Sequence, residues 1–180
     1  MPRIEPINKQ DATGDSQDLL QQVESKMGKV PNILGTLAHS PAALQAYLAF
    51  SEALGKSAFS GAEREQISLA ISEVNRCNYC VSAHTAIFGG LGGSGEAAAR
   101  ARLGEADDGR MTGALGFART LVEKSGWASD DDLAKAREAG LGDREIVELV
   151  AMVAFNTLTN YANHVAETEN DFPKVPEPGS

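Results

Sequence analysis

Two cysteines and a histidine lie close together in the chain, at spacings that suit thiol chemistry. Cys80 follows Cys77 by three residues, and His84 follows Cys80 by four. In a helix, side chains three or four residues apart share a face, with Cβ atoms about 5–6 Å apart. A disulfide needs Cα atoms about 4.4–6.8 Å apart, so this pair can be oxidised and reduced without a large backbone movement.

His84 and a more distant acid, Glu65, supply proton chemistry to the cysteine pair. A histidine beside a thiol can take its proton or hold the thiolate as an ion pair, and the thiolate is the nucleophile. Glu65 belongs to the preceding predicted helix. If the two helices pack antiparallel, its carboxylate can orient His84 or relay its proton. The set suits attack by one cysteine on a peroxide oxygen, after which the sulfenic acid condenses with the other cysteine to give a disulfide.

The same residues allow less specific interpretations. A CxxC pair followed by a histidine can bind zinc, but a structural zinc site usually needs a second pair of ligands, and the remaining histidines are His39 and His164. Two buried cysteines can also be inert packing residues. Taken alone, Glu65 is typical of a solvated or capping carboxylate, and His164 of a hydrogen-bonded core histidine.

Composition narrows the class of protein. The chain has 180 residues, with 25 Asp and Glu against 16 Lys and Arg and a net charge of −9. Such a chain is unsuited to binding nucleic acid, because binding requires cations that displace the phosphate counterions. It is equally unsuited to binding anionic membrane surfaces. The longest apolar run, from Leu149 to Phe155, is far shorter than the ~20 residues of a membrane-spanning helix. The N-terminus has no apolar signal-peptide core, so the expected location is cytoplasmic, where a CxxC pair is more often catalytic or metal-binding than structural.

The pattern of apolar residues, caps and breakers predicts an all-α fold. A composition with only 6 % aromatic residues and many alanines favours helix over strand, and no segment alternates with period two. We expect one domain spanning residues 1–180, with an N-terminal arm over 1–15 and a proline-rich tail over 173–180. Between them we expect seven or eight helices joined by short loops.

Serine caps and one long periodic segment locate several of these helices. Residues 30–32 are predicted to be a loop, and the longest helix is predicted from about Asp143 to about Glu169. Serine N-caps are expected before four helices, at Ser40, Ser60, Ser94 and Ser129.

Residues 63–84 and 143–164 resemble each other faintly at an offset of 80. Both begin with an acidic residue followed by Arg-Glu, and both carry a leucine and then a histidine at matching positions. Only the first segment has cysteines; the second has Thr157 and Asn160 in their places. This match predicts two helical hairpins related by a pseudo-twofold axis.

The cysteine constellation resembles the AhpD-like alkylhydroperoxidase and carboxymuconolactone decarboxylase superfamily. The family pattern is a glutamate, a cysteine twelve residues on, and then CxxC and CxxxH. Glu65, Cys77, Cys80 and His84 match it at every one of these positions. The motif is specific because several residue types and spacings must agree together.

Two further segments extend this resemblance. Asn160–His164 and Asp171–Pro173 look like the peroxidase-related subgroup, so the similarity runs from Val30 to Pro173. The resemblance implies an AhpD-like helical bundle that assembles into trimers or hexamers. It also implies thiol-dependent reduction of hydroperoxides.

Carried over position by position, the resemblance implies a role for each residue. Cys80 would be the peroxidatic nucleophile, and Cys77 the more exposed resolving cysteine. His84 would be the general base, and Glu65 its partner in a proton relay. Tyr79 departs from the well-known alkylhydroperoxidase pattern, which has histidine before the second cysteine. The lipoamide-linked electron donor of the founding member is therefore not assumed for this chain.

The sequence thus predicts a thiol-dependent peroxidase that needs no cofactor or metal. It would reduce a small hydroperoxide with electrons from an unidentified dithiol donor, as a homo-trimer or homo-hexamer. Tyr79, Glu73 and His164 are expected to surround the four principal residues. One alternative is decarboxylation of a carboxymuconolactone-like acid, although family members with that activity do not rely on a CxxC pair. Another is a non-enzymatic redox-sensing or metal-binding oligomeric module.

Overall fold

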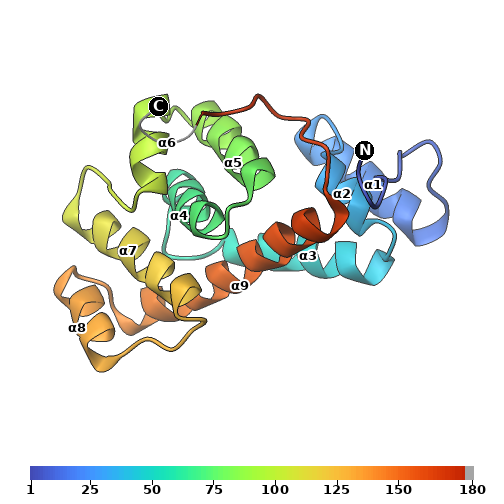
Figure 1. The fold of residues 1–180 in the computed structure, drawn as a ribbon. Helices are drawn as coiled ribbons and strands as arrows, with labels where there is room; N and C mark the ends of the chain where they lie inside the picture. The colour runs from blue at the N-terminus through green and yellow to red at the C-terminus, as the bar shows by residue number, and fades with distance from the viewer. Residues whose placement is uncertain (177–180) are drawn as a thin grey trace.

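The computed structural model describes residues 1–176, and nine helices make up all of the regular secondary structure in that range (Figure 1). The predicted all-α fold is therefore confirmed. In chain order the helices are α1 (Gly14–Met27), α2 (Asn32–Leu37), α3 (Pro41–Leu54), α4 (Gly61–Val74), α5 (Asn78–Gly90), α6 (Gly95–Arg102), α7 (Gly109–Glu123), α8 (Asp130–Glu138) and α9 (Asp143–Ala166).

Two clusters of buried side chains form the core, and the long helix α9 passes along both (Figure 1). The larger cluster joins α4 to α7, α8 and α9 around fully buried residues such as Leu69 and Leu149. The smaller cluster joins α1, α2 and α3 to the start of α5, and it includes both cysteines. The cysteine pair therefore lies where α1, α2 and α3 pack against the start of α5.

The predicted serine caps are confirmed. Ser60 and Ser129 each accept a hydrogen bond from the backbone three residues on, and an acidic side chain there bonds back to complete a capping box. Ser40 and Ser94 accept the same backbone bond before α3 and α6. At the opposite end of α1, Gly28 has φ +75°, a left-handed conformation that glycine adopts without strain.

The boundaries differ from prediction in three places. Residues 32–37 form the short helix α2, where a loop was expected to reach Asn32; a six-residue helix is too short to show a clear apolar period. Helix α1 begins at Gly14, inside the predicted arm. Helix α9 ends at Ala166 rather than near Glu169, because Glu167 has φ +48°.

Both ends of the described range, residues 1–176, pack back onto the helices. In the arm, the Arg3 amide donates to the Ala166 carbonyl at 2.6 Å and the Ile7 amide to the Gly35 carbonyl at 3.0 Å. Figure 1 shows the C-terminal segment leaving α9 and returning over α5 toward α6. There the Arg102 side chain donates to the carbonyl of Pro176 at 2.6 Å. Residues 177–180 of the predicted tail lie outside the described part of the chain.

The predicted pair of repeated hairpins is not confirmed. Residues 63–84 do form a hairpin, from α4 and α5. Residues 143–164, however, lie within the single uninterrupted helix α9. No helix in the described residues is long and apolar enough to cross a membrane.

Candidate functional site

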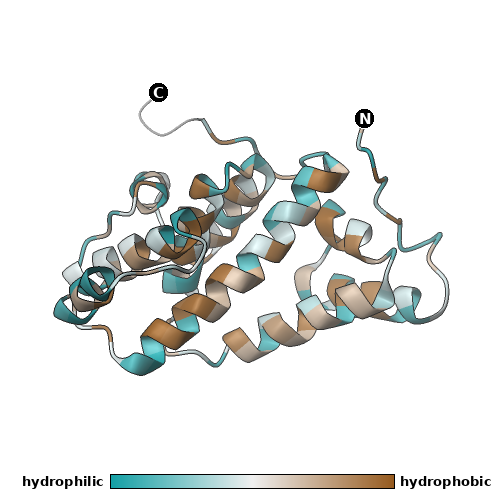
Figure 2. Ribbon diagram, turned by 60° about the horizontal axis from the view of Figure 1, so that its bottom comes forward, coloured by the Kyte–Doolittle hydropathy of each residue, from teal (hydrophilic) through white to brown (hydrophobic). Residues whose placement is uncertain are grey.

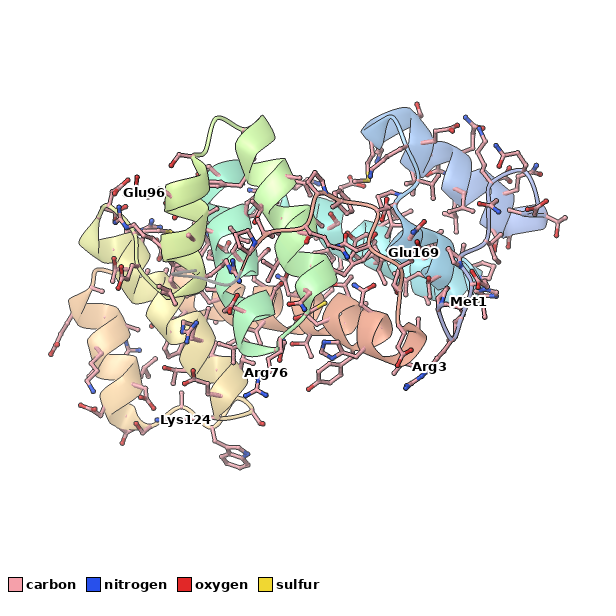
Figure 3. All side chains as sticks on the ribbon, turned by 45° about the horizontal axis from the view of Figure 1, so that its top comes forward. Met1, Arg3, Arg76, Glu96, Lys124 and Glu169 are labelled. Atoms are coloured by element: carbon pink, nitrogen blue, oxygen red, sulfur yellow. The ribbon has the colours of Figure 1, made fainter. Side chains whose placement is uncertain are left out.

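The turn between α4 and α5 places the cysteines at the start of a helix. Arg76 follows α4 with φ +56°, the Cys77 amide donates to the Ser72 carbonyl at 2.9 Å, and the Arg76 amide donates to the Glu73 carbonyl at 3.0 Å. These bonds form a Schellman motif, which usually has glycine in the left-handed position. The Arg76 side chain is exposed on the outside of this turn (Figure 3). Cys77 is consequently the N-cap of α5, and Cys80 lies in its first turn.

The two thiols are in direct contact. Their Sγ atoms are 2.9 Å apart, and both cysteines are free. A disulfide bond is about 2.05 Å long, so a small movement separates the reduced from the oxidised pair. Cys77 is 2 % exposed and Cys80 is 3 % exposed. The implied greater exposure of Cys77 is therefore wrong for this chain, because α1–α3 cover both residues.

The thiol pair favours loss of one proton near neutral pH. A hydrogen bond from Cys80 lowers the pKa of Cys77 to about 7, against the opposing effect of burial, and Asn163 and His84 contribute in the same direction. The pKa of Cys80 is raised, first by that shared hydrogen bond and then by burial. The N-terminus of α5 also stabilises negative charge. These values belong to the pair, since its proton can move along the short Sγ–Sγ contact.

His84 and Glu65 form the expected contact between α5 and α4. His84 Nδ1 lies 2.7 Å from Glu65 Oε2, and both side chains are largely buried. The helices run antiparallel through the Arg76 turn, which brings residues 19 positions apart side by side. Because Glu65 engages Nδ1, Nε2 is the nitrogen of His84 left for proton exchange.

Helix α9 contributes amides that the sequence analysis did not single out. Asn163 Nδ2 donates to Cys80 Sγ at 3.2 Å. One turn earlier, Asn160 Oδ1 accepts from Asn75 Nδ2 at 2.8 Å, and Asn160 Nδ2 lies 3.5 Å from Ser72 Oγ. Asn156, Asn160 and Asn163 are all buried. Their spacing of four and three residues, on the side of α9 that also buries leucine and methionine, is a signal that could have located them.

Tyr79 lies under the C-terminal segment. Its hydroxyl donates to Asp171 Oδ1 at 2.6 Å and accepts from the Ile33 amide at 3.2 Å. Burial and then the bond to Asp171 raise the pKa of Tyr79. Burial alone would raise the pKa of Asp171, but hydrogen bonds from Tyr79 and Lys29 lower it. Phe172 packs edge-on against the Tyr79 ring, with centroids 5.7 Å apart.

Two hollows share lining residues, and the smaller one reaches Cys80. A chamber of about 60 Å³ touches Cys80, His84 and Asn163, and Phe172 helps to close it. A larger cavity of about 390 Å³ is lined by His84 and Glu65 and by apolar side chains of α1, α2, α3, α5 and α9. His84 and Tyr47 line both. Burial, then the nearby Glu65 and Cys80, raise the pKa of Tyr47 to about 12, so its hydroxyl stays protonated.

Two of the surrounding residues lie away from the thiols. Glu73 accepts from Arg102 at 2.6 Å, on the side of α4 that faces α6. His164 is exposed and stacks on Tyr161 with ring centroids 6.5 Å apart, so its interpretation as a core histidine is wrong. It lies one residue past the buried Asn163, which turns it to the outer side of α9. Among residues 1–176, no three His, Cys, Asp or Glu side chains are grouped so that they could hold a metal ion.

Comparison with known proteins finds a family model and solved structures that are similar to this chain. The carboxymuconolactone decarboxylase family model matches residues 41–124. A solved structure described as an alkylhydroperoxidase AhpD core, an uncharacterized peroxidase-related protein from Ralstonia eutropha JMP134, is 28 % identical with a TM-score of 0.83, covering 94 % of this chain and 92 % of that one. An uncharacterized peroxidase-related protein from Silicibacter sp. TM1040 is 27 % identical with a TM-score of 0.81 and the same coverage, 94 % and 92 %.

A more distant solved structure shares the fold. The debrominase Bmp8 is 16 % identical with a TM-score of 0.78, covering 93 % of this chain and 91 % of that one. No curated protein matches the chain. The helical fold, the matched family model and the two peroxidase-related neighbours agree, and they support the resemblance of the chain to the AhpD-like carboxymuconolactone decarboxylase superfamily.

Proposed function

We propose that the protein is a thiol-dependent peroxidase that reduces hydroperoxides through a Cys77–Cys80 dithiol–disulfide cycle. The observation that carries the proposal is the 2.9 Å contact between the two Sγ atoms, with the His84–Glu65 pair beside them. Cys80 lines the small chamber, which supports it as the attacking thiolate. Cys77 lies within bonding range of the product sulfenic acid.

The proposed cycle has three steps. The Cys80 thiolate attacks the terminal oxygen of ROOH, the O–O bond breaks, and RO⁻ leaves with a proton from His84 to give ROH. The Cys77 thiol then attacks the sulfenic acid, which releases water and forms the disulfide. A dithiol reductant returns the pair to two thiols by exchange, a step suited to a cytoplasmic location.

The larger cavity supports an organic substrate. Its lining includes Val23, Leu48, Ile87 and Phe155, whose apolar side chains suit a hydrocarbon group, and Lys26, Glu52 and Arg64 line it as well. Since both hollows share His84, a peroxide group in the chamber can carry its tail into the larger cavity. We therefore propose an alkyl hydroperoxide as the substrate class.

Thiol titration tests the proposed function. One equivalent of tert-butyl hydroperoxide should remove both thiols of the wild-type protein, and a dithiol should restore them. Cys80→Ser should lose peroxide consumption, whereas Cys77→Ser should stop at a sulfenic acid. Unchanged turnover in Cys80→Ser would exclude this mechanism. Decarboxylation of a carboxymuconolactone-like acid that survives replacement of both cysteines by serine would establish the alternative.

We further propose that the protein self-associates through α9. Exposed apolar residues recur along this helix every three or four positions, and Figure 2 shows hydrophobic residues recurring along it. They are Val147, Val150, Ala154, Leu158, Tyr161 and Val165. A stripe of this spacing suits a second helix of the same kind. Light scattering should give a multiple of the 19.0 kDa chain mass, and Leu158→Asp should reduce it; a wild-type protein of single-chain mass would contradict the proposal.

A further inference from the structure

Asn163 holds a buried oxygen that no group in the described residues satisfies. Its side chain is 5 % exposed, and Nδ2 donates to Cys80 Sγ at 3.2 Å. Oδ1 has no hydrogen-bond partner within residues 1–176. Folded proteins seldom leave an amide oxygen buried without a partner, because the group gives up its bonds to water on burial. A buried acceptor oxygen without a partner, beside a nucleophile, indicates that a bound ligand donates the missing hydrogen bond.

The position of Asn163 identifies where that ligand lies. Four buried side-chain oxygens lack a partner in the described residues, and they belong to Thr85, Asn156, Asn163 and Thr168. Of these residues, only Asn163 lines the chamber that also contains Cys80 and His84.

Three other polar side chains around the chamber already make hydrogen bonds. The Tyr79 hydroxyl donates to Asp171, the Thr159 hydroxyl donates to the Asn156 carbonyl, and His84 Nδ1 contacts Glu65. Asn163 Oδ1 therefore provides a free acceptor at the chamber wall, beside the ring of His84. A molecule that enters the chamber and carries an O–H group can donate to this oxygen.

We propose that Asn163 orients the hydroperoxide, by accepting the hydrogen bond of the peroxide O–H at Oδ1 while Nδ2 holds the Cys80 sulfur. This inference rests on the proposed peroxidase function and adds a selectivity to it. Both atoms belong to one planar amide, so an oxygen that donates to Oδ1 is held next to Sγ. That oxygen is the terminal one, the atom that the thiolate must attack to leave RO⁻ as the departing group.

The chemistry of this contact selects a class of substrate. A hydroperoxide has the O–H that Oδ1 requires, whereas a dialkyl peroxide or a thiosulfonate has no hydrogen-bond donor. Without the donor, Oδ1 stays unsatisfied when the chamber fills, and discrimination of this kind is strong at buried polar sites. The site should therefore prefer hydroperoxides to other thiol-reactive molecules of similar size.

The test compares two thiol reagents that differ in this donor. Second-order rate constants for tert-butyl hydroperoxide and for methyl methanethiosulfonate are measured well above the thiol pKa found for each variant, so that the thiolate fraction does not differ. In Asn163→Leu we expect the hydroperoxide-to-thiosulfonate ratio to fall about tenfold, as for the loss of one hydrogen bond. The measured thiol pKa should also rise, because the amide donor is lost.

Two further variants separate this role from a structural one. Asn163→Asp keeps an oxygen acceptor but removes the donor, so it should raise the thiol pKa yet retain a ratio within about threefold of wild type. Thr85→Val removes a buried unpartnered oxygen that lines neither hollow, and it should leave the ratio unchanged.

The outcomes distinguish this inference from the proposed function. A wild-type ratio in Asn163→Leu, or an equal fall in Thr85→Val, overturns the role of Asn163 while the peroxidase remains. If Asn163→Leu does not fold, a tenfold fall in Asn163→Asp overturns it as well. Failure of the wild-type protein to react with hydroperoxide, with normal thiosulfonate labelling, overturns the peroxidase itself.

Discussion

Residues 63–84 and residues 143–164 share a beginning and a buried leucine, but only the first segment turns. Leu69 and Leu149 are both fully buried in the larger core cluster. Glu63 and Glu145 both cap their helices and both contact Arg110, at 2.9 Å and 3.4 Å. The segments therefore enter the same core in similar ways.

The two segments separate at the position of Arg76. Its left-handed backbone ends α4 and begins α5 two residues later. At the matching position of α9, Asn156 is helical, and the helix continues to Ala166. His84 consequently turns back toward Glu65, whereas His164 lies on the exposed side of its helix.

This difference gives the two segments complementary parts of one site. A chain that turns creates a new helix N-terminus, which places the thiols where the helix dipole stabilises a thiolate. A chain that continues presents side chains along one face, and α9 uses that face to bring Asn160 and Asn163 to the turn. The first segment thus supplies the reactive groups, and the second supplies amides that contact them.

The largest expected effect distinguishes the two matching histidines. His84→Ala should lower the rate constant for hydroperoxide reduction by about 10²–10⁴, the usual contribution of a general acid–base group. His164→Ala should leave the rate unchanged, because this histidine is exposed on the outer side of α9. The measurement is stopped-flow loss of thiols at neutral pH. Equal losses in both variants would show that the segments are functionally alike.

A smaller effect separates the two matching glutamates. Glu65→Gln removes the carboxylate charge beside His84 Nδ1, and we expect a loss of about tenfold to a hundredfold in rate with an unchanged fold. Glu145→Gln keeps the cap on the Gly142 amide but weakens the pair with Arg110, which should cost about 0.5 kcal/mol of unfolding free energy and no activity. A rate loss in Glu145→Gln would contradict this division of roles.

The pH dependence reports on the helix N-terminus that only the first segment has. Since the thiolate reacts, the rate should rise about tenfold per unit as pH increases toward 7 and level off above it. In Cys77→Ala the thiol of low pKa is lost and only Cys80 remains, whose pKa burial raises, so the midpoint should move to higher pH. Iodoacetamide labelling between pH 5 and 10 measures both curves. An unshifted midpoint in Cys77→Ala would show that the thiols titrate independently.

The sequence identified the parts of the site that lie on one hairpin. Cys77, Cys80 and His84 are local in the chain, and a single antiparallel packing brings Glu65 to them, so spacing alone was informative. The structure adds that Cys77 is the N-cap of α5, a position that the sequence does not mark because the left-handed residue before it is Arg76 and not glycine.

The parts that sequence reasoning missed come from distant segments. Asn163 reaches Cys80 across 83 residues and Asp171 reaches Tyr79 across 92, contacts that helical periodicity does not encode. The assignment of His164 failed for a related reason. Taken alone, His164 was expected to be a core histidine, but α9 continues without a turn and leaves this residue on its exposed side.

The smallest expected effect reverses sign between the two segments. Arg76 is the non-glycine residue at the turn, and its exposed side chain makes no hydrogen bond or ion pair within residues 1–176. Arg76→Gly should therefore relieve backbone strain and raise the unfolding free energy by about 0.5–1 kcal/mol. The same change at the matching position, Asn156→Gly, puts glycine inside a helix and empties a buried position, so it should lower the unfolding free energy by more than about 1 kcal/mol.

Urea unfolding followed by circular dichroism measures both variants. A fall in stability for Arg76→Gly would mean that the arginine side chain itself holds the turn. The expected gain would mean instead that the left-handed turn is held by other interactions, although arginine is strained there. These are the backbone hydrogen bonds to Ser72 and Glu73 and the packing of the two cysteines. In that case the site keeps its geometry through the core it is built on, and the reactivity of Arg76→Gly should match that of the wild-type protein.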